Sequence, residues 1–374
     1  MIKRLIQKTI LKDLAKNKVL VLLGARQVGK TTLLENLISD KKKSLWINCD
    51  NFDERLLLEH KTTTELRHLL SPYEIVCIDE AQRVTDIGLT IKMVADIKDL
   101  NTHVIITGSS ALELSEGINE PATGRTIEYK LFPFSLAELA ANTSLREETR
   151  MLEQRMIYGL YPNIVTDQAD ARRNLINLAN NYLYKDLLAF KGIQKPVVLQ
   201  KLVRALALQL GNEVSYNELA GLLGIDKETV ESYIDLLEKS FVVFRLESYS
   251  RNLRNEIRKG KKVYFFDNGV RNAVISNFAP LELRNDTGAL WENLMISERV
   301  KRNAYSESYA RMYFWRTHDQ KEIDLIEEMD GKLSAFEIKY NPKAKAALPK
   351  NFLNSYPDTA FKIVNSENFS EFIF

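Results

Sequence analysis

The chain has 374 residues, of which 45% are hydrophobic and 27% charged, and its formal net charge at pH 7 is +2. This length exceeds one ordinary hydrophobic core, so we expect a soluble globular protein of two to four domains. The small net charge excludes a global polyanion-binding surface, and any nucleic-acid contact must come from a local patch.

The N-terminal segment MIKRLIQKTILKDLAKNK is basic and amphipathic. No long apolar segment with a cleavage site follows it, and the nearby run VLVLL is too short to span a bilayer. We therefore expect a cytoplasmic protein with no signal peptide and no membrane partner. Cys49 and Cys77 lie in apolar strand-like runs, which predicts buried, reduced thiols.

The first third of the chain alternates short apolar runs with segments of helical spacing. The predicted strands are KVLVLL, KSLWINCD, YEIVCID, THVIITG and RTIEYKLF, and helical segments such as TTLLENLI and IGLTIKMVADIK lie between them. This alternation predicts an α/β domain in which helices cover both faces of a parallel sheet.

A phosphate-binding pattern follows the first predicted strand, in GARQVGKTT. Gly24, Gly29, Lys30 and Thr31 match the P-loop: the glycines let backbone N–H groups surround phosphates, the lysine reaches the β/γ oxygens, and the threonine hydroxyl ligates Mg²⁺. A chance match in a chain of this size occurs on the order of one per cent of the time. The predicted ATP site comprises Gly24, Ala25, Arg26, Gln27, Val28, Gly29, Lys30, Thr31 and Thr32.

An acidic pair ends the strand in EIVCIDEAQ. We expect Asp79 to hold the magnesium ion through water, and Glu80 to orient or deprotonate the attacking water. A simple loop start is the alternative, which the preceding P-loop disfavours.

Two further candidates lie downstream. The strand ending in ITGSS places hydroxyls, with Ser109 as the catalytic candidate, at the sheet edge where they can bond the γ-phosphate or the attacking water; ordinary turn chemistry is the alternative. Arg125 precedes the next strand, where it can stabilise phosphoryl charge in a neighbouring subunit. A solvated arginine at the strand edge explains the same spacing.

These segments carry a family resemblance. GARQVGKTTLL, IDEAQ, ITGSSALEL and GRTIEYKLFPFSLAEL resemble the bacterial and archaeal AAA+-type ATPases whose C-terminal half is a domain of unknown function. YGLYPNIV and NNYLYKDLL resemble the lid helices of that family, and KKVYFFDNGVRNAV a later strand. The resemblance implies a P-loop ATPase with nucleotide-driven assembly or switching. GLYPN departs from the expected second glycine and acidic residue, which leaves the sensor arginine of the lid unassigned.

Residues 196–250 are helical in pattern until a final strand. VVLQKLVRALALQLG, SYNELAGLLG and DKETVESYIDLLEKS have helical spacing, Ser215 and Asp226 are the expected N-caps, and FVVFRLESYS follows. Three helices, a turn at Gly224 and a strand predict a winged helix, whose third helix enters the major groove in DNA-binding versions. The outer face of that helix is mostly acidic here, which argues against base readout.

A basic run follows at residues 251–262, RNLRNEIRKGKK, with six basic residues and one acid. Such a run can neutralise phosphates and is the candidate DNA contact. A solvated wing or linker is the alternative.

A charged hairpin is predicted in EIDLIEEMDGKLSAFEIKY. An Asp-Gly pair, Asp330 and Gly331, favours a two-residue turn with Met329 opposite Lys332. Continuing this register along the two strands puts Asp324 opposite Glu337, and Lys339 opposite Glu322. The apolar pairs Ile323–Ile338 and Leu325–Phe336 then lie on the other face, which is buried.

Opposed carboxylates repel each other unless a cation or a proton relieves them. Asp324, Glu337 and Lys339 are similar to the Asp…Glu-x-Lys constellation of restriction-endonuclease-like nucleases, a resemblance confined to residues 286–374. It implies a further acid on the preceding core helix, which is Glu292, and a second Mg²⁺ or Mn²⁺ held by Glu292, Asp324 and Glu337 with Lys339 as a catalytic residue. A charged, solvated hairpin without metal is the alternative.

The sequence thus predicts five segments: an ATPase core (1–134), a helical lid (135–195), a winged helix (196–250), a basic connector and strand (251–285), and a small restriction-endonuclease-like α/β domain (286–374). Three functions fit: an ATPase that drives a DNA-handling tail, an ATP-regulated metal-dependent nuclease, or an ATP-gated protein-binding or assembly switch with an inactive tail. We expect a nucleotide-dependent homo-oligomer.

Overall fold

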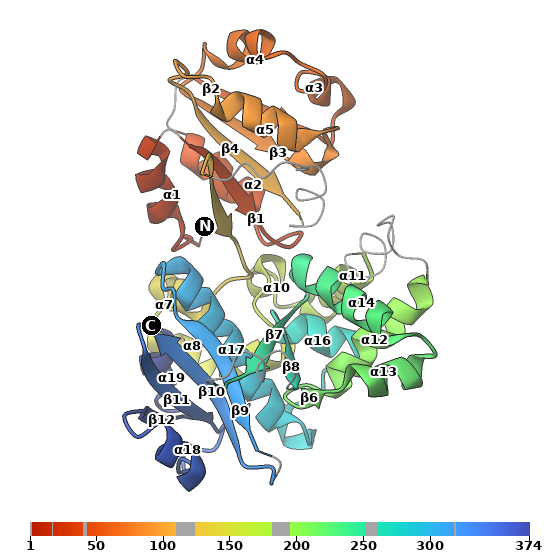
Figure 1. Ribbon diagram of the computed structural model, residues 1–374, viewed down its shortest axis with the longest axis vertical. Coiled ribbons are helices and arrows are strands. Elements are labelled where there is room, and N and C mark those ends of the chain that lie inside the picture. The colour runs from red at the N-terminus through yellow and green to blue at the C-terminus, as the bar shows by residue number, and fades with distance from the viewer. Residues whose placement is uncertain are drawn as a thin grey trace. The chain divides into compact units, whose positions relative to one another are not determined.

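The computed structural model describes residues 2–16, 18–39, 43–109, 124–181, 195–250, 260–317 and 319–374. The chain forms two compact units, the first of residues 1–132 with 239–241 and the second of residues 133–238 with 242–374. Figure 1 labels many of their helices and strands. No helix within the described ranges is long and apolar enough to cross a membrane.

The first unit is built on a five-stranded, fully parallel sheet of order β2-β3-β4-β1-β5 (Figure 1). The strands lie where the sequence predicts them: β1 (Val19–Leu23), β2 (Ser44–Asn48), β3 (Ile75–Asp79), β4 (His103–Gly108) and β5 (Thr126–Lys130). All five residues of β1 and of β3 are buried, as expected for central strands of a parallel sheet.

Helices alternate with these strands, as the apolar periodicity requires. They are α1 (Gln7–Asp13), η1 (Leu14–Lys16), α2 (Lys30–Ile38), α3 (Phe52–Arg55), α4 (Thr63–Leu70), η2 (Ala81–Arg83) and α5 (Ile87–Ala95). A capping box at Thr62 and Glu65 begins α4. Cys49 and Cys77 are free and buried as predicted, and burial raises the pKa of each thiol to about 12.

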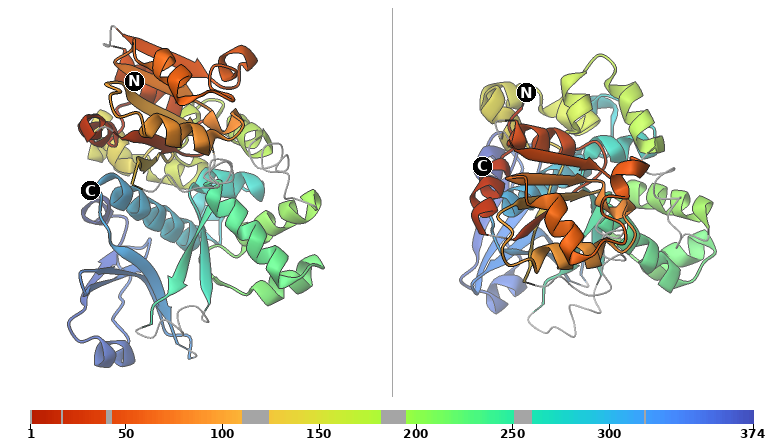
Figure 2. Two further views of the ribbon diagram at one scale, coloured as in Figure 1. Left: turned by 45° about the horizontal axis from the view of Figure 1, so that its top comes forward. Right: turned by 90° about the horizontal axis from the view of Figure 1, so that it is seen from above.

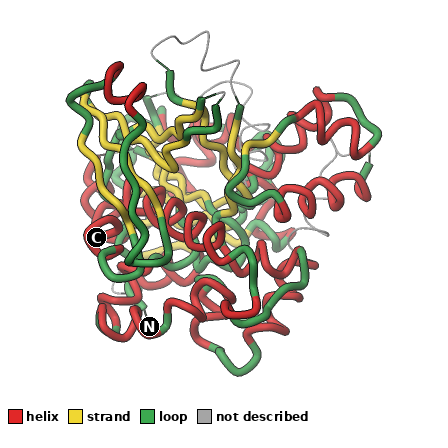
Figure 3. Tube along the Cα trace, turned by 90° about the horizontal axis from the view of Figure 1, so that it is seen from below, coloured by secondary structure: helices red, strands yellow, loops and turns green. Residues whose placement is uncertain are grey.

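The second unit is built on one mixed sheet of seven strands, ordered β12-β11-β10-β9-β7-β8-β6. Figure 3 shows its strands in yellow between red helices. The strands are β6 (Glu213–Val214), β7 (Val243–Ser248), β8 (Lys261–Phe265), β9 (Arg311–Arg316), β10 (Glu322–Met329), β11 (Lys332–Ile338) and β12 (Ala360–Val364). Because β7 pairs with β9 in parallel, strands from three of the predicted segments share one sheet.

The helices that the structure describes in the second unit fall into three stretches of chain. The first holds α7 (Leu136–Asn142), α8 (Leu145–Arg150), α9 (Leu152–Tyr158), α10 (Pro162–Thr166) and α11 (Ala171–Ala179). The second holds α12 (Pro196–Leu208), α13 (Tyr216–Leu223) and α14 (Lys227–Lys239). The third holds α16 (Asn268–Val274), η4 (Leu281–Leu283), α17 (Thr287–Tyr305), α18 (Lys350–Ser355) and α19 (Phe369–Ile373).

The helices of the predicted lid segment contact the second unit. Helix α9 packs on α16 and α17, and α11 packs on α16 (Figure 2). Gly159 explains one close contact, since a Cβ there would lie 2.1 Å from Asp267 Oδ1. The buried Asp267 carboxylate accepts hydrogen bonds from the backbone N–H groups of Leu160 (2.7 Å) and Val270 (3.0 Å), and so ties the GLYPN turn to the start of α16.

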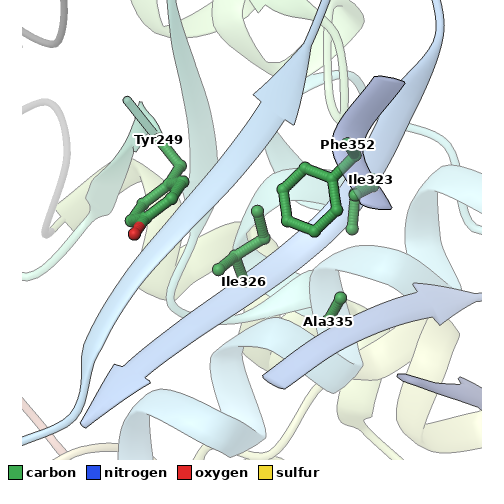
Figure 4. Packing of buried hydrophobic residues seen from close by; sticks show 5 residues of the cluster. All are labelled: Tyr249, Ile323, Ile326, Ala335 and Phe352. Carbon is green, nitrogen blue, oxygen red and sulfur yellow. The ribbon is translucent and has the colours of Figure 1, made fainter. Parts of the chain in front are cut away.

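An apolar cluster supports the C-terminal hairpin. Tyr249, Ile323, Ile326, Ala335 and Phe352 pack together in Figure 4. The pairing of β10 with β9 shifts by one residue between Ile323 and Ile326, which is a β-bulge. The strict alternation predicted for this strand is therefore broken, and Ile323 packs in the same cluster as Ile326.

Candidate functional site

The loop between β1 and α2 has the conformation that its glycines permit. Gly29 has a φ of +93° and precedes the first residue of α2. A Cβ on Gly24 would lie 2.2 Å from the carbonyl oxygen of Leu131, so only glycine fits there. Gln27 also has a positive φ, of 61°. Alternating left-handed residues before a helix turn successive N–H groups inward and create an anion-binding concavity.

Lys30 is held inside this loop. Its side chain is buried, and its Nζ donates hydrogen bonds to the carbonyl oxygens of Gly24 (2.8 Å) and Ala25 (3.0 Å). Burial lowers the pKa of Lys30 to about 8, against the opposing charges of Glu80 and Asp79. The ammonium group is thus mainly charged at pH 7, at the centre of the predicted phosphate site.

Asp79, at the end of β3, joins the loop to the neighbouring strand. Its Oδ2 accepts a hydrogen bond of 2.9 Å from the Thr31 hydroxyl, and its Oδ1 accepts one from Thr107 on β4. Thr107 Oγ1 in turn accepts the backbone N–H of Glu80 at 3.1 Å. The structure therefore brings together the two predicted magnesium ligands, the Thr31 hydroxyl and the Asp79 carboxylate, with the predicted base Glu80.

Gln82 was not predicted and lies between two predicted residues. Its Nε2 donates hydrogen bonds to Glu80 Oε2 (2.5 Å) and to Ser109 Oγ (2.9 Å). Its Oε1 is buried and has no hydrogen-bond partner among the described residues. Glu80 has a left-handed backbone, with a φ of 52°, which turns the chain from β3 into this contact. Its position two residues after the acidic pair is the signal that sequence reasoning missed.

Arg4 is a second residue that the sequence analysis missed. The guanidinium is buried, and donates hydrogen bonds to the carbonyl oxygens of Val28 in the loop (2.8 Å) and Phe132 (2.5 Å). It therefore supports the loop from outside. Nothing in the basic N-terminal segment distinguished this arginine from its neighbours.

The residues of the first unit suit a magnesium nucleotide. Mg²⁺ in nucleotide sites usually binds one or two carboxylates together with phosphate oxygens and waters. The Thr31 hydroxyl lies 2.9 Å from Asp79 Oδ2, so two oxygen ligands for a magnesium ion lie side by side next to the phosphate-binding loop. Throughout the described ranges, no group of three His, Cys, Asp or Glu side chains could hold a metal ion by itself.

Arg125 lies before β5 with its side chain partly exposed. Its Nε is 2.6 Å from Oδ1 of Asp96, which is also exposed. In this chain the arginine thus has a local partner, and its action on a neighbouring subunit stays a prediction.

The C-terminal hairpin has the predicted turn and register. Asp330 and Gly331 both have positive φ, and the ladder runs from Met329–Lys332 to Leu325–Phe336. Beyond it, the backbone N–H of Ile338 donates to Asp324 Oδ2 at 2.7 Å. The ladder ends at Leu325–Phe336, so the expected position of Lys339 opposite Glu322 lies beyond it.

Lys339 instead contacts both carboxylates of the predicted site. Its Nζ lies 3.0 Å from Asp324 Oδ2 and 2.9 Å from Glu337 Oε2. Both acids are buried, so this is not a solvated face. Burial and then the charge of Asp324 raise the pKa of Glu337 to about 7, while Lys339 opposes the rise. Asp324 and Glu337 raise the pKa of Lys339 above its ordinary value, although burial alone would lower it.

Glu292, the third predicted metal ligand, is buried near Asp324, since burial and then the charge of Asp324 raise its pKa, while Lys262 opposes the rise. Its Oε1 accepts hydrogen bonds from Tyr264 Oη (2.6 Å) and from the buried Lys262 (3.1 Å). Lys262 also forms an ion pair with Glu322, which takes the place of the expected Glu322–Lys339 pair. The predicted second metal is therefore unsupported: two ammonium groups, of Lys262 and Lys339, neutralise the carboxylates that it would bridge.

The segment predicted as a winged helix has its expected caps. Ser215 accepts from the backbone N–H of Glu218, and Asp226 accepts from that of Thr229 at 2.6 Å. Gly224 ends α13 with a φ of +66°. Two acids of α14 pair with strand residues: Glu231 lies 3.7 Å from Lys261, and Asp235 lies 2.7 Å from Arg245.

Only the end of the basic run lies in the described residues. Of its two described lysines, Lys261 pairs with Glu231 on α14 and Lys262 is buried among acids. Both described lysines therefore have acidic partners within the protein. Residues 251–259, with the other four basic side chains, lie outside the described residues.

Family comparisons divide the chain into three parts. A family described as an AAA domain matches residues 16–140. Two families described as domains of unknown function match residues 149–281 and 287–372. Residues 16–140 therefore have an AAA-type P-loop ATPase fold.

The relatives found by sequence are themselves uncharacterized. An uncharacterized protein of Mycobacterium tuberculosis is 26% identical over 328 residues, covering 86% of this chain and 70% of the relative. One from Haemophilus influenzae is 24% identical over 349 residues, covering 86% of this chain and 83% of the relative. One from Methanocaldococcus jannaschii is 24% identical over 347 residues, covering 86% of this chain and 75% of the relative.

Among solved structures, the chain is similar to the Walker-type ATPase of Pyrococcus abyssi. The TM-score is 0.50 at 17% identity, and the match covers 74% of this chain and 96% of the other. This likeness supports the ATPase fold.

Proposed function

We propose that this protein is a Mg²⁺-dependent ATP hydrolase whose nucleotide state controls its second unit. One observation carries the proposal: the hydrogen-bonded network of Thr31, Asp79 and Thr107 stands beside the buried ammonium group of Lys30. These are the donors, acceptors and charge that a bound triphosphate with its metal ion requires.

Each residue has a definite task in this proposal. Lys30 and the N–H groups of the loop bind the phosphate oxygens. Thr31 and Asp79 would hold a magnesium ion, which would neutralise charge on the phosphates. Glu80 accepts a proton from the attacking water. Ser109 orients that water or the γ-phosphate, and the unpartnered Oε1 of Gln82 accepts the water's other hydrogen.

Two substitutions test the ATPase activity. Lys30→Ala is expected to abolish binding of ATP, because the positive charge at the phosphates is lost. Glu80→Gln is expected to bind ATP with wild-type affinity and to lose turnover by about 10²–10⁴-fold, the usual contribution of a general base. Fluorescent-nucleotide titration measures the first effect and phosphate release the second. Hydrolysis by Glu80→Gln at the wild-type rate would remove Glu80 from this role.

We further propose that residues 196–250 form a winged helix and that residues 251–285 connect it to the next domain. Residues 286–374 are, in this proposal, a restriction-endonuclease-like domain. The order supports this: three helices, α12 to α14, precede the antiparallel strands β7 and β8. Because the described end of the basic run is neutralised, an ATP-gated protein-binding or assembly switch is the alternative to a DNA-binding tail.

Nuclease activity is a second candidate, because Asp324, Glu337 and Lys339 are in contact in a buried site. Incubation of plasmid with Mg²⁺ or Mn²⁺, with and without ATP, tests cutting, and Glu337→Ala is the control.

Metal binding is tested separately by thermal melts. A ligand stabilises only the state that binds it, so a metal held at the hairpin raises the melting temperature. Asp324→Asn should then lose the Mn²⁺ response, with Lys30→Ala in both proteins to remove nucleotide-linked metal. Equal Mn²⁺ responses in the two proteins would exclude the metal site.

A further inference from the structure

A small pocket lies in the second unit between α17, β11, β12 and α19, away from the hairpin acids. Its volume is about 230 Å³, and Arg299, Arg302, Ser334, Phe336, Lys362 and Phe372 are among its lining residues. Side chains of successive strand residues point to opposite faces. Phe336 lines this pocket, so the neighbouring Glu337 carboxylate faces the other side of the sheet. We call this hollow the α17–α19 pocket.

Arg299 lines the α17–α19 pocket, and several contacts hold its side chain in place. Its Nε and Nη2 bind the two carboxylate oxygens of Glu327, at 2.8 and 2.5 Å. Its guanidinium carbon also lies 4.7 Å from the ring centre of Phe372. Glu327 therefore has Arg299 as its ion-pair partner, although the charge of Glu327 also acts on Arg302. Glu371 is the acidic residue among those that line the pocket.

Arg302 is the second arginine that lines the pocket, and its hydrogen-bond partner is the main chain of Phe374. Its Nε donates to the main-chain oxygen of Phe374 at 3.0 Å, and no acid of the described residues forms an ion pair with it. Arg299 lies one helical turn away, where like charges destabilise a helix. Burial and then the charge of Arg299 lower the pKa of Arg302, while the charge of Glu327 opposes this shift. An anion in the pocket would relieve this repulsion.

Lys362 stands at the rim. Its Nζ is 3.8 Å from Glu371, and both side chains are largely exposed, so this ion pair is weak. Donors from three elements thus line one hollow: Arg302 on α17, Ser334 on β11 and Lys362 on β12. Donors converging from different directions suit a tetrahedral oxyanion better than a planar carboxylate.

We propose that the α17–α19 pocket binds a phosphate group. Its size supports a small ligand, because pockets for drug-sized molecules usually have about 300–1,000 Å³. The phosphate can come from free inorganic phosphate or from a polynucleotide backbone. This inference does not depend on ATP hydrolysis by the first unit.

The test is equilibrium dialysis of ³²P-labelled inorganic phosphate against the full chain carrying Lys30→Ala, which removes the phosphate site of the P-loop. We expect one bound phosphate per chain. Adding Arg302→Gln is expected to weaken binding at least tenfold, because a charge-assisted hydrogen bond is lost. Lys362→Ala, at an exposed position that tolerates substitution, should also weaken it. Lys332→Ala, an exposed lysine outside the pocket, is the matched control.

A short oligodeoxythymidylate added as competitor distinguishes the two sources. Displacement of the labelled phosphate assigns the pocket to a polynucleotide backbone, and retention assigns it to free phosphate. The proposal is overturned if Lys30→Ala protein binds no phosphate, or if Arg302→Gln and Lys362→Ala bind as well as Lys332→Ala.

Discussion

At the scale of single residues, Gln82 links the proposed base, Glu80, to Ser109 at the end of the neighbouring strand β4. Its amide holds Glu80 Oε2 and Ser109 Oγ together, at 2.5 and 2.9 Å. A hydrogen bond to a charged group contributes about 1.5–3 kcal/mol, so losing one that positions the base should slow catalysis roughly tenfold or more.

Gln82→Ala is therefore expected to lower kcat about tenfold with little change in KM. Steady-state phosphate release measures both constants. Arg83→Ala is the matched control, because Arg83 pairs with the exposed Asp50 at 3.1 Å, outside this contact. A kcat for Gln82→Ala equal to that of Arg83→Ala would show that Glu80 needs no such support.

Lys30 makes nucleotide binding depend on pH. Because its pKa is about 8 rather than 10.5, the free protein loses this charge above pH 8. We expect the affinity for ADP to be constant near pH 7 and to fall above pH 8, approaching tenfold per pH unit as binding takes up one proton. Titration of fluorescent ADP from pH 6.5 to 9.5 measures this fall.

Lys30→Arg is the control for that titration. Its guanidinium stays charged at pH 9.5, so its weaker affinity should not fall in the same way. A parallel fall in both proteins would place the titration elsewhere. Between pH 8 and 10.5 the folded state also binds fewer protons at Lys30 than the unfolded state, so this residue's contribution to stability rises with pH.

At the scale of elements, the C-terminal hairpin should respond to pH in the opposite sense. The pKa of Glu337 is raised from 4.5 to about 7, so between these values the folded state binds more protons than the unfolded state. The contribution of Glu337 to the free energy of unfolding therefore falls as pH rises from 4.5 to 7. One pKa unit corresponds to about 1.4 kcal/mol, so the change is on the order of 1 kcal/mol or more.

Glu337→Gln is expected to abolish the loss of stability that Glu337 causes as pH rises. The melting temperature of this variant minus that of the wild type should therefore be larger at pH 7.5 than at pH 5. Thermal melts at both pH values provide the comparison. Glu367→Gln, at an exposed position in the same unit, is the control. If Glu337→Gln and Glu367→Gln follow the wild type equally, proton uptake at the hairpin is refuted.

At the scale of the whole molecule, Arg125 tests whether subunits share an active site. Its pair with Asp96 is partly exposed, and such pairs contribute only about 0–1 kcal/mol, so the arginine can exchange partners at little cost. Lys30→Ala and Arg125→Ala chains each lack a different half of a shared site.

An equimolar mixture of these two proteins is therefore expected to hydrolyse ATP several-fold faster than either protein alone. Asp96→Ala, which frees Arg125, should keep wild-type turnover. The shared site is excluded if Arg125→Ala alone has wild-type activity, or if mixing restores none.

Local patterns determined much of this protein from the sequence alone. The five parallel strands, the P-loop from Gly24 to Thr32 and the hairpin turn at Asp330 and Gly331 follow from apolar periodicity and turn chemistry, which act over a few residues. The predicted caps Ser215 and Asp226 are of the same kind. For these features, the residues that specify the structure are neighbours along the chain.

Only the tertiary structure decided which distant groups meet. Gln82 lies 27 residues from Ser109, and Lys262 lies 30 residues from Glu292 and is buried with it. The parallel pairing of β7 with β9 joined segments that the sequence had separated. The bulge in β10 lets Ile323 and Ile326 pack in one cluster. Charge alone could not predict whether Asp324 and Glu337 meet a metal ion or an ammonium group. That depends on which side chains of other elements reach the same buried space, and a one-dimensional pattern does not record it.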